Sequence, residues 1–445
     1  MNHSPFPKIQ PLNLKQKTIS GFFWHFIENF ARLGITFIIG IILARLLSPR
    51  EFGLIGMVSI FIILSQVFID SGFNQALIRK KNCTQEDYST VFYFNIITSL
   101  LFYLILFCIA GAISAFFNEP QLKLIVRVLG LGLVISAFAI VQRAKLTKKI
   151  DFKLQAKISL ISSISSGILA IIFALKGYGV WSIIFKRLIE YMLTSILLWI
   201  WSKWIPSLIF NIKSFKEMFS FGSKLLISDL IERIYQNIYL LIIGKYFSAT
   251  DLGFYSRANE FSQLSSQNIS NVIGRVSYPV LSSLQDDIPI LKATFKKLVK
   301  SAMLIIFISM FGMAAIAKSM VLTLIGEKWL PSVVFLQLLC FVGVFYSLNS
   351  INLNLLQVQG RSDIVLKLGI INKLIAVPFI IIGIFFGIKV LIVGLIINSA
   401  IAFFLNSYWS GKHIGYSSIQ QIVDLFPAVL ISSAMGVIVY TAGLF

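Results

Sequence analysis

Long apolar runs recur along the whole sequence, and they restrict its fold more than any other feature. Each run is about 20 residues long, which is the length that an α-helix needs to cross a lipid bilayer. Hydrophobic residues make up 57% of the chain and charged residues only 13%, about half the charged share of an average soluble protein. The sequence therefore predicts an all-α polytopic membrane protein.

We expect each apolar run to form one transmembrane helix, and thirteen such runs are present. Their predicted ranges are 19–46, 52–77, 89–116, 122–142, 153–175, 178–201, 217–246, 252–280, 293–317, 332–358, 364–386, 389–409 and 419–444. Residues 1–18 are polar and are expected to form a disordered cytoplasmic arm. This arm lacks the short apolar core and cleavage site of a signal peptide, so the first run is expected to remain as a helix.

The segment that joins the first two apolar runs returns 200 residues later. Leu43–Leu54 reads LARLLSPREFGL, and Ile243–Phe254 reads IGKYFSATDLGF. Matching pairs at this distance are Arg45 with Lys245, Ser48 with Ser248, Glu51 with Asp251, and Gly53 with Gly253. In the same register, Asn29 falls on Asp229 and Arg32 on Glu232. The repeat predicts two halves that each begin with the same helical hairpin.

This repeat and the apolar runs together predict the domain organisation. A first bundle of six helices is expected over residues 19–201, a linker over 202–216, and a second six-helix bundle over 217–409. Residues 410–445 add a loop and a thirteenth transmembrane helix. Because the first bundle holds an even number of helices, the two bundles are expected to be parallel repeats, with a substrate site between them.

Lysine and arginine residues concentrate in alternate loops, which predicts how the chain is oriented. The rich loops include residues 79–81, 143–153 and 292–300, whereas the loops between them hold few basic residues. Because basic loops are retained in the cytoplasm, the N-terminus is expected on the cytoplasmic side. The same distribution accounts for the net charge of +21 and gives no reason to expect a nucleic-acid partner.

Charged side chains inside apolar helices are candidate functional residues, because each costs about 2.5–3.5 kcal/mol at the bilayer centre. Glu28 and Arg32 lie four residues apart on one face of the first helix. The other in-helix charges that we single out are Asp70, Lys186, Arg187, Glu190, Asp229, Glu232, Arg233, Arg257, Glu260 and Lys373. Ion pairs within the bundle and side chains that extend to the interface are the alternative explanations, favoured at Asp70 and Lys373.

Motifs of enzymes and metal sites are missing from the sequence. The three histidines lack a second ligand at metal spacing, and the three cysteines are too widely spaced for a metal site or a disulfide framework. Neither a P-loop nor a Gly-x-Ser-x-Gly motif occurs. We therefore expect a protein that is not an enzyme and that binds no metal cofactor.

Several short motifs together resemble bacterial polysaccharide exporters of the Wzx type. The motifs are LARLLSPREFGL at 43–54, DSGFNQALIRKK at 70–81, TQEDYSTVF at 84–92, IDFK at 150–153, GYGVW at 177–181, LGFYSRA at 252–258 and GEKW at 326–329. The resemblance covers about residues 18–425 and is strongest for the colanic-acid and teichuronic-acid exporters. These exporters share a superfamily with the MATE drug antiporters and the lipid II flippases, and their members usually have fourteen transmembrane helices.

The resemblance implies a fold, a substrate and a location. The two six-helix bundles are expected to form a MATE-like V in the bacterial inner membrane. The expected function is to flip undecaprenyl-diphosphate-linked oligosaccharide by alternating access, for the synthesis of O-antigen or exopolysaccharide. The expected partners are membrane lipid, this glycan, a polysaccharide polymerase and a chain-length regulator.

A diphosphate substrate gives the in-helix charges expected roles. Arg32, Arg233 and Arg257 are candidates for binding the diphosphate, because a guanidinium can bind phosphate oxygens through two hydrogen bonds. Lys186 and Arg187 are further candidates. The carboxylates of Glu28, Asp229, Glu232 and Glu260 are expected to pair with these arginines or to bind a coupling H⁺ or Na⁺.

Three other functions remain open at this stage. A MATE-type antiporter of small molecules would favour an acidic or aromatic cavity, whereas the in-helix charges here include as many basic as acidic residues. A lipid II flippase would need similar cavity chemistry, but the hairpin sequence resembles the exporters more. A scaffold that transports nothing would leave the charges inside the helices without a purpose.

Overall fold

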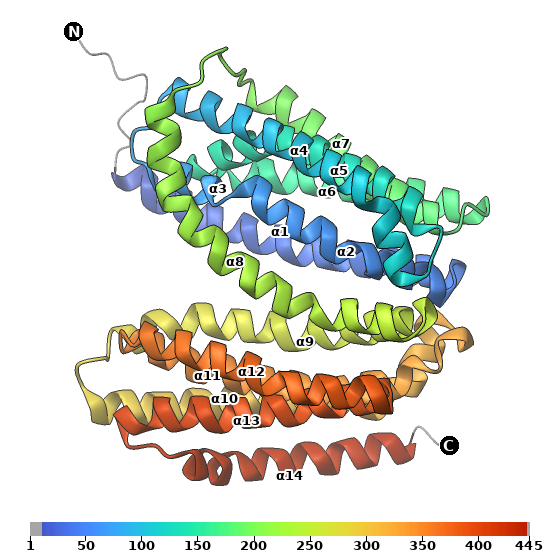
Figure 1. Ribbon diagram of the computed structural model, residues 1–445. Coiled ribbons are helices and arrows are strands. Elements are labelled where there is room, and N and C mark those ends of the chain that lie inside the picture. Colours follow the sequence, from blue (N-terminus) through green and yellow to red (C-terminus); the bar gives the residue numbers. More distant parts are fainter. Residues whose placement is uncertain (1–10, 443–445) are drawn as a thin grey trace. The chain divides into compact units, whose positions relative to one another are not determined.

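The computed structural model describes residues 11–442, and these residues form helices without any β-strand (Figure 1). The first eight helices are α1 (Pro11–Leu46), α2 (Pro49–Asp70), α3 (Phe73–Arg79), α4 (Gln85–Phe117), α5 (Leu122–Lys148), α6 (Phe152–Leu175), α7 (Val180–Ser202) and α8 (Ile212–Tyr246). The remaining six are α9 (Ala249–Ser282), α10 (Ile288–Ile325), α11 (Ser332–Val358), α12 (Ser362–Phe386), α13 (Ile388–Ile414) and α14 (Ser418–Ala442). The all-α prediction is therefore confirmed.

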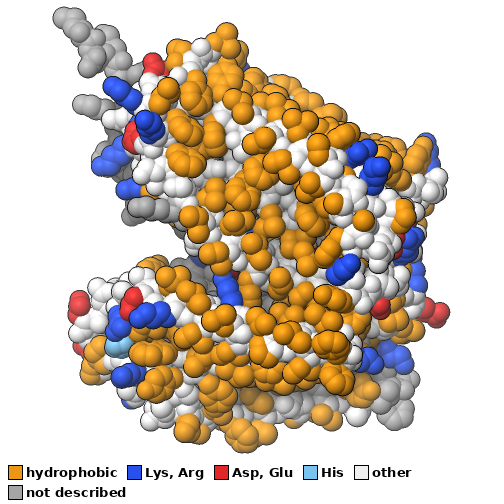
Figure 2. All heavy atoms as spheres, in the orientation of Figure 1, with side chains coloured by type: hydrophobic (Ala, Val, Ile, Leu, Met, Phe, Trp, Pro, Cys, Tyr) orange, Lys and Arg blue, Asp and Glu red, His pale blue; other side chains and the backbone are white. Residues whose placement is uncertain are grey.

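The chain consists of two compact units, and the boundary between them lies between Lys245 and Tyr246. The first unit contains α1–α7 and nearly all of α8, and the second contains α9–α14. In each unit the visible surface is largely hydrophobic along the lengths of the helices (Figure 2). The two six-helix bundles over residues 19–201 and 217–409 were inferred from the repeat in the sequence. This division into bundles stays a prediction.

Each predicted transmembrane range falls on one long helix, with one exception. The range 52–77 is broken at Ser71–Gly72 into α2 and α3, because both residues adopt a left-handed conformation, with φ of 45° and 70°. α8 crosses the chain at this break. A Cβ atom on Gly72 would lie 2.8 Å from the Cα atom of Gly222, so only glycine allows the two backbones to approach so closely.

The prediction of a disordered arm over residues 1–18 was wrong for part of its length. Helix α1 already begins at Pro11, where the missing N–H and fixed φ of proline suit a first helical position. Residues 1–10 lie outside the described residues. Within α1, the stretch Ile27–Leu46 is long and apolar enough to cross a membrane.

Ten stretches of the described residues are long and apolar enough to span a bilayer. The three long helices that fall short are α7, α8 and α9. These helices carry most of the predicted site residues, including Lys186 and Arg187 in α7, Asp229 and Arg233 in α8, and Arg257 in α9. The chain is a multi-pass membrane protein whose polar groups are concentrated in a few of its helices.

The repeated residues of the sequence have a structural explanation, because they begin two helices. Ser48 precedes α2, and its N–H donates to Oε2 of Glu51 at 2.6 Å. At the equivalent place before α9, the N–H of Ser248 donates to Oδ2 of Asp251 at 3.3 Å, and the N–H of Asp251 donates to Oγ of Ser248 at 3.0 Å. Both pairs form capping boxes, which satisfy backbone N–H groups at a helix start.

Small polar side chains hold the core of the second unit together. Oγ of Ser262 in α9 donates to the carbonyl oxygen of Leu339 in α11 at 2.9 Å, and Oγ of Ser270 donates to Oγ of Ser347 at 2.7 Å. Between these bonds the two helices pack closely: a Cβ atom on Gly343 would lie 3.0 Å from Cβ of Ser266. Small residues and hydrogen bonds of this kind are the usual means of packing helices in membranes.

Candidate functional site

Charged side chains from three helices lie within electrostatic range of one another in the first unit. Arg143 near the end of α5 interacts electrostatically with Glu28 and Arg32 of α1 and with Glu190 and Tyr191 of α7. Within α7, Lys186 forms an ion pair with Glu190, with 3.2 Å between Nζ and Oε2. We call these six residues the α1–α5–α7 cluster. The structure thus brings together the predicted residues Glu28, Arg32 and Lys186, which are distant in the sequence.

Arg143 was missed as a site residue by the sequence analysis. The predicted helix ended at residue 142, so Arg143 was counted among the basic residues of the following loop. Helix α5 instead continues to Lys148, because Ala144, Lys145 and Leu146 all have high helix propensity. The high helix propensity of residues 144–146 predicts that the helix continues beyond residue 142. This signal would have placed Arg143 in the helix.

The charge balance of the α1–α5–α7 cluster favours an anion. Among the six residues of this cluster, three are basic (Arg32, Arg143 and Lys186) and two are carboxylates (Glu28 and Glu190). Arg187 lies half-buried next to Lys186 on α7 and adds a further positive charge nearby. The guanidinium groups of Arg32 and Arg143 interact electrostatically. Such a pair suits a ligand with several phosphate oxygens, since each guanidinium can donate two parallel hydrogen bonds.

A second group of predicted residues lies along α8, also in the first unit. Arg233 donates to Asp229 at 3.3 Å between Nε and Oδ1, and Gln236 donates to Glu232 at 2.9 Å. Asp229, Glu232 and Arg233 are all exposed, although they lie in the middle of a 35-residue helix. Exposed charges at this depth in a membrane protein are expected to face water or other polar groups rather than lipid.

Asp70 and Lys373, for which the sequence analysis favoured structural roles, lie in different units. The carboxylate of Asp70 accepts a hydrogen bond from the backbone N–H of Asn74 at 3.2 Å, at the break between α2 and α3. Asp70 also interacts electrostatically with Asp229 of α8. Lys373 is half-buried in α12 of the second unit.

Arg257, in the second unit, differs from the other predicted arginines because its side chain is only 8% exposed. Its Nη1 atom lies 2.6 Å from Oε2 of Glu260, one turn further along α9. Glu260 is the exposed member of this pair. The pair therefore presents a carboxylate at the surface of α9, with the arginine behind it.

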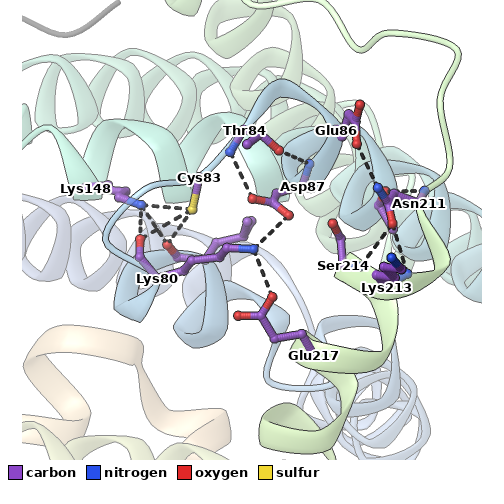
Figure 3. A network of polar contacts seen from close by, with 12 residues as sticks. Lys80, Cys83, Thr84, Glu86, Asp87, Lys148, Asn211, Lys213, Ser214 and Glu217 are labelled. Atoms are coloured by element: carbon purple, nitrogen blue, oxygen red, sulfur yellow. Dashed lines mark hydrogen bonds and ion pairs between the residues drawn. The ribbon is translucent and has the colours of Figure 1, made fainter. Parts of the chain in front are cut away.

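Within the first unit, polar contacts hold the start of α8 against the start of α4 (Figure 3). Nζ of Lys80 lies 3.1 Å from Oδ1 of Asp87 and 3.0 Å from Oε2 of Glu217, so it joins the start of α4 to α8. Nζ of Lys148 at the end of α5 donates to the carbonyl oxygen of Leu77 at 3.2 Å and to Sγ of Cys83 at 2.9 Å. Partial burial alone would lower the pKa of Lys80, but the hydrogen bonds to Glu217 and Asp87 outweigh it and raise the pKa.

Metal ligands are not assembled anywhere in residues 11–442, where no group of three His, Cys, Asp or Glu side chains could hold an ion. The charged clusters described above are ion pairs and hydrogen-bonded carboxylates. They are suited to binding and to charge neutralisation.

Comparison with known proteins places these features in context. The profile of a family described as polysaccharide biosynthesis protein matches residues 42–334. The chain is 27% identical to the teichuronic acid biosynthesis protein TuaB of Bacillus subtilis over 305 residues, which are 68% of this chain and 63% of TuaB. It is 25% identical to the lipopolysaccharide biosynthesis protein WzxC of Escherichia coli over 445 residues, which cover 96% of this chain and 89% of WzxC.

A solved structure shares the fold. The inward closed conformation of the lipid II flippase MurJ superposes with a TM-score of 0.71 and 16% sequence identity, over 96% of this chain and 97% of that one. The sequence-based resemblance to polysaccharide exporters and the polytopic fold class are confirmed by these comparisons. The similar proteins named above are biosynthesis proteins of teichuronic acid and lipopolysaccharide and a lipid II flippase. The chain belongs with such proteins and is not an enzyme.

Proposed function

The chain belongs to the polysaccharide biosynthesis protein family, and from this premise we propose that it flips undecaprenyl-diphosphate-linked oligosaccharide across the bacterial inner membrane. The observation that most supports this proposal is the α1–α5–α7 cluster, where basic side chains outnumber carboxylates inside a membrane protein. A lipid-linked diphosphate is an anion that must cross the membrane with its glycan. A cluster with excess positive charge would lower the energy of that anion within the bilayer.

In this proposal, the arginines exchange partners during transport. Arg32 and Arg143 bind the diphosphate, while Lys186 stays within reach of Glu190. When substrate leaves, Glu28 and Glu190 neutralise the basic side chains, which keeps unpaired charge from being left in the membrane. One of the carboxylates, or Asp229 and Glu232 on α8, would bind the coupling H⁺ or Na⁺. Alternating access and a cytoplasmic N-terminus complete the proposal.

The charge of the α1–α5–α7 cluster favours an anionic substrate over the cations that a small-molecule antiporter would carry. A small-molecule antiporter for cations would be served better by a cluster with excess negative charge, which is the opposite of the α1–α5–α7 cluster. A polysaccharide polymerase and a chain-length regulator are the partners that an exporter of this kind would require. Both interactions remain proposals.

Deletion of the gene in its native host tests the proposal directly. We expect lipid-linked glycan to accumulate on the cytoplasmic face of the inner membrane and surface polysaccharide to be lost, with both effects reversed by the intact gene. Unchanged surface polysaccharide in a host without a second exporter would contradict the proposal, and assays of drug efflux would then test the antiporter.

Complementation by point variants tests the site. Arg143→Gln should reduce export by about tenfold or more, because one charge-assisted contact to the diphosphate is worth about 1.5–3 kcal/mol. Arg127→Gln is the matched control, since Arg127 is also in α5 but is 4.1 Å from the ring centre of Phe107 and donates to its backbone oxygen. Equal export by the two variants, at equal amounts in the membrane, would show that the cluster is not the binding site.

A further inference from the structure

The segment between α7 and α8 presents apolar side chains to the outside, which is unusual for a loop. We call residues 203–212 the strap. Leu208 is 94% exposed and Ile205 is 73% exposed. Further large hydrophobic side chains exposed on the strap are Ile209, Phe210 and Ile212. Loops in water are normally polar, so a run of exposed apolar side chains indicates that something apolar covers them.

Hydrogen bonds to the first turns of α4 hold the strap in place. Nε2 of Gln85 donates to the carbonyl oxygen of Ile205 at 2.7 Å, the N–H of Ser207 donates to Oγ of Ser89 at 2.9 Å, and the N–H of Asn211 donates to Oγ1 of Thr90 at 2.9 Å. These side chains satisfy backbone groups that no helix satisfies here. The exposed apolar side chains are therefore presented by a segment whose backbone is fixed.

Trp204 anchors the strap in the core of the first unit, where it is buried. Its Nε1 atom donates to Oε1 of Gln85 at 2.8 Å, and its ring packs edge-on against the rings of Tyr88 and Phe92. Burial of this one aromatic side chain leaves the neighbouring Ile205 and Leu208 outside. The strap thus has a buried anchor and an exposed apolar edge.

The charged residues within 203–216 are all positive, and a nearby carboxylate, that of Glu86 in α4, accepts a hydrogen bond from Nδ2 of Asn211 at 2.7 Å. Between residues 203 and 216 the sequence contains no Asp or Glu, whereas Lys203, Lys213 and Lys216 are all exposed. Lysine also meets tryptophan nearby, since Nζ of Lys157 lies 4.8 Å from the ring centre of Trp201 at the end of α7. Lysine and tryptophan side chains are enriched where transmembrane helices leave the bilayer, because both have an apolar part and a polar end.

We propose that the strap binds anionic phospholipid in the leaflet at this end of the first unit, with its apolar side chains at the acyl boundary and its lysines on the headgroup phosphates. The two long helices that it joins both end here, and the strap is short, so it cannot lie far from the bilayer surface. Exposed apolar side chains bracketed by lysines match the two layers that an anionic leaflet offers. An acidic protein surface would match the lysines but would not account for the apolar edge.

A fluorescent label on the strap tests this proposal in the full-length protein. In the background Cys108→Ser, which leaves only the buried Cys83 and Cys340, the substitution Leu208→Cys allows an environment-sensitive dye to be attached at that position. The labelled protein is placed in nanodiscs of phosphatidylcholine, with or without phosphatidylglycerol, and nitroxide-bearing versions of either lipid act as quenchers. We expect quenching by both lipids, and stronger quenching by phosphatidylglycerol.

A matched pair of variants separates charge recognition from proximity. Lys203→Gln with Lys213→Gln should abolish the preference for phosphatidylglycerol and weaken its binding in detergent micelles by about 30-fold at low salt. Lys123→Gln with Lys176→Gln removes the same charge from two exposed lysines at other helix ends and should keep the preference.

Other outcomes would overturn the proposal. Equal quenching by the two lipids in the unsubstituted protein would show that the strap does not recognise the anionic headgroup. A label that no lipid quenches would show that the strap faces water. If that label were nevertheless shielded from a soluble quencher in native membranes, the occupant would be a protein.

Discussion

At the residue scale, single positions decide which charges this membrane protein can hold. Asp87 has a side chain that is only 1% exposed. Its carboxylate forms an ion pair with Lys80 and accepts a hydrogen bond from the backbone N–H of Thr84 at 2.9 Å. Glu217, the other partner of Lys80, is 63% exposed. The two ion pairs of the same lysine therefore contribute differently, because water screens only one of them.

Lys80→Met should accordingly destabilise the protein more than Glu217→Gln. Loss of Lys80 leaves a buried carboxylate without its cation, which costs about 1–3 kcal/mol, whereas loss of the exposed acid costs less than about 0.5 kcal/mol. The measurement is the apparent melting temperature of the purified protein in one detergent. A larger shift for Glu217→Gln would mean that the exposed pair carries the stability.

The raised pKa of Lys80 sets the expected pH dependence. A lysine whose pKa is raised by folding stabilises the protein fully below its ordinary pKa, and this stabilisation is lost as pH rises through the raised value. The difference in stability between the unsubstituted protein and Lys80→Met should therefore be constant at neutral pH and shrink only above about pH 10.4. A difference that shrinks at mildly alkaline pH would contradict this assignment.

At the scale of elements, backbone contacts determine how α8 lies on the first unit. Gly72 meets Gly222 at the break between α2 and α3, and the Lys80 ion pairs fix the beginning of α8 close by in the sequence. The left-handed φ of Gly72 disfavours a side chain at this position, and the proximity of Gly222 excludes one. α8 is thus positioned by a glycine contact, by an ion pair and by apolar packing, in which Phe215 and Phe219 contact the ring of Phe73.

Gly72→Ala should therefore cost more stability than Gly177→Ala. Both residues have φ near 70–80°, but a Cβ on Gly177 would meet no atom within 4 Å, so that variant suffers only the backbone strain of about 1–2 kcal/mol. Gly72→Ala adds a collision with the backbone of α8. Melting temperature and export by complementation are the measurements, and equal effects of the two variants would show that the α8 contact is dispensable.

The capping boxes at the starts of α2 and α9 allow a comparison between the two halves. Ser48→Ala and Ser248→Ala should each lower stability by about 1 kcal/mol, because each removes a side chain from a helix start, whereas Ser→Asn at either position should be nearly neutral. The two losses should add, since the residues belong to different units. Loss of stability at only one position would show that the matching sequences do not have matching roles.

At the scale of the whole molecule, the order of helices could be predicted from the sequence, but the site could only be predicted in part. Each long helix falls on an apolar run of the sequence, although α7, α8 and α9 are less apolar than the helices that are clearly able to cross a membrane. The break at Gly72 could not be foreseen, since it depends on Gly222, which is distant in the sequence. Arg143 was missed because a basic residue after an apolar run was taken to mark the end of the helix. Arg257 is buried by tertiary packing, which the sequence pattern does not predict.

The thirteen long helices within residues 11–442 also predict where the chain emerges from the membrane. A reporter fused after residue 415 should lie in the cytoplasm, and one fused after residue 442 should lie outside, because α14 would cross the bilayer between them. Fluorescent protein and alkaline phosphatase fusions report the two locations, and a fusion after residue 81 is the cytoplasmic control. The same location for both C-terminal fusions would show that α14 does not span the membrane.

The paired capping boxes have a consequence for the history of the chain. Several of the residues that recur after 200 positions lie at a helix start, as Ser48 and Ser248 do, whereas Arg32 in one half corresponds to Glu232 in the other. A duplicated ancestral half would have kept the groups that both copies needed to fold. The electrostatic character of the two copies was then free to diverge, and the first unit is now richer in lysine and arginine than the second.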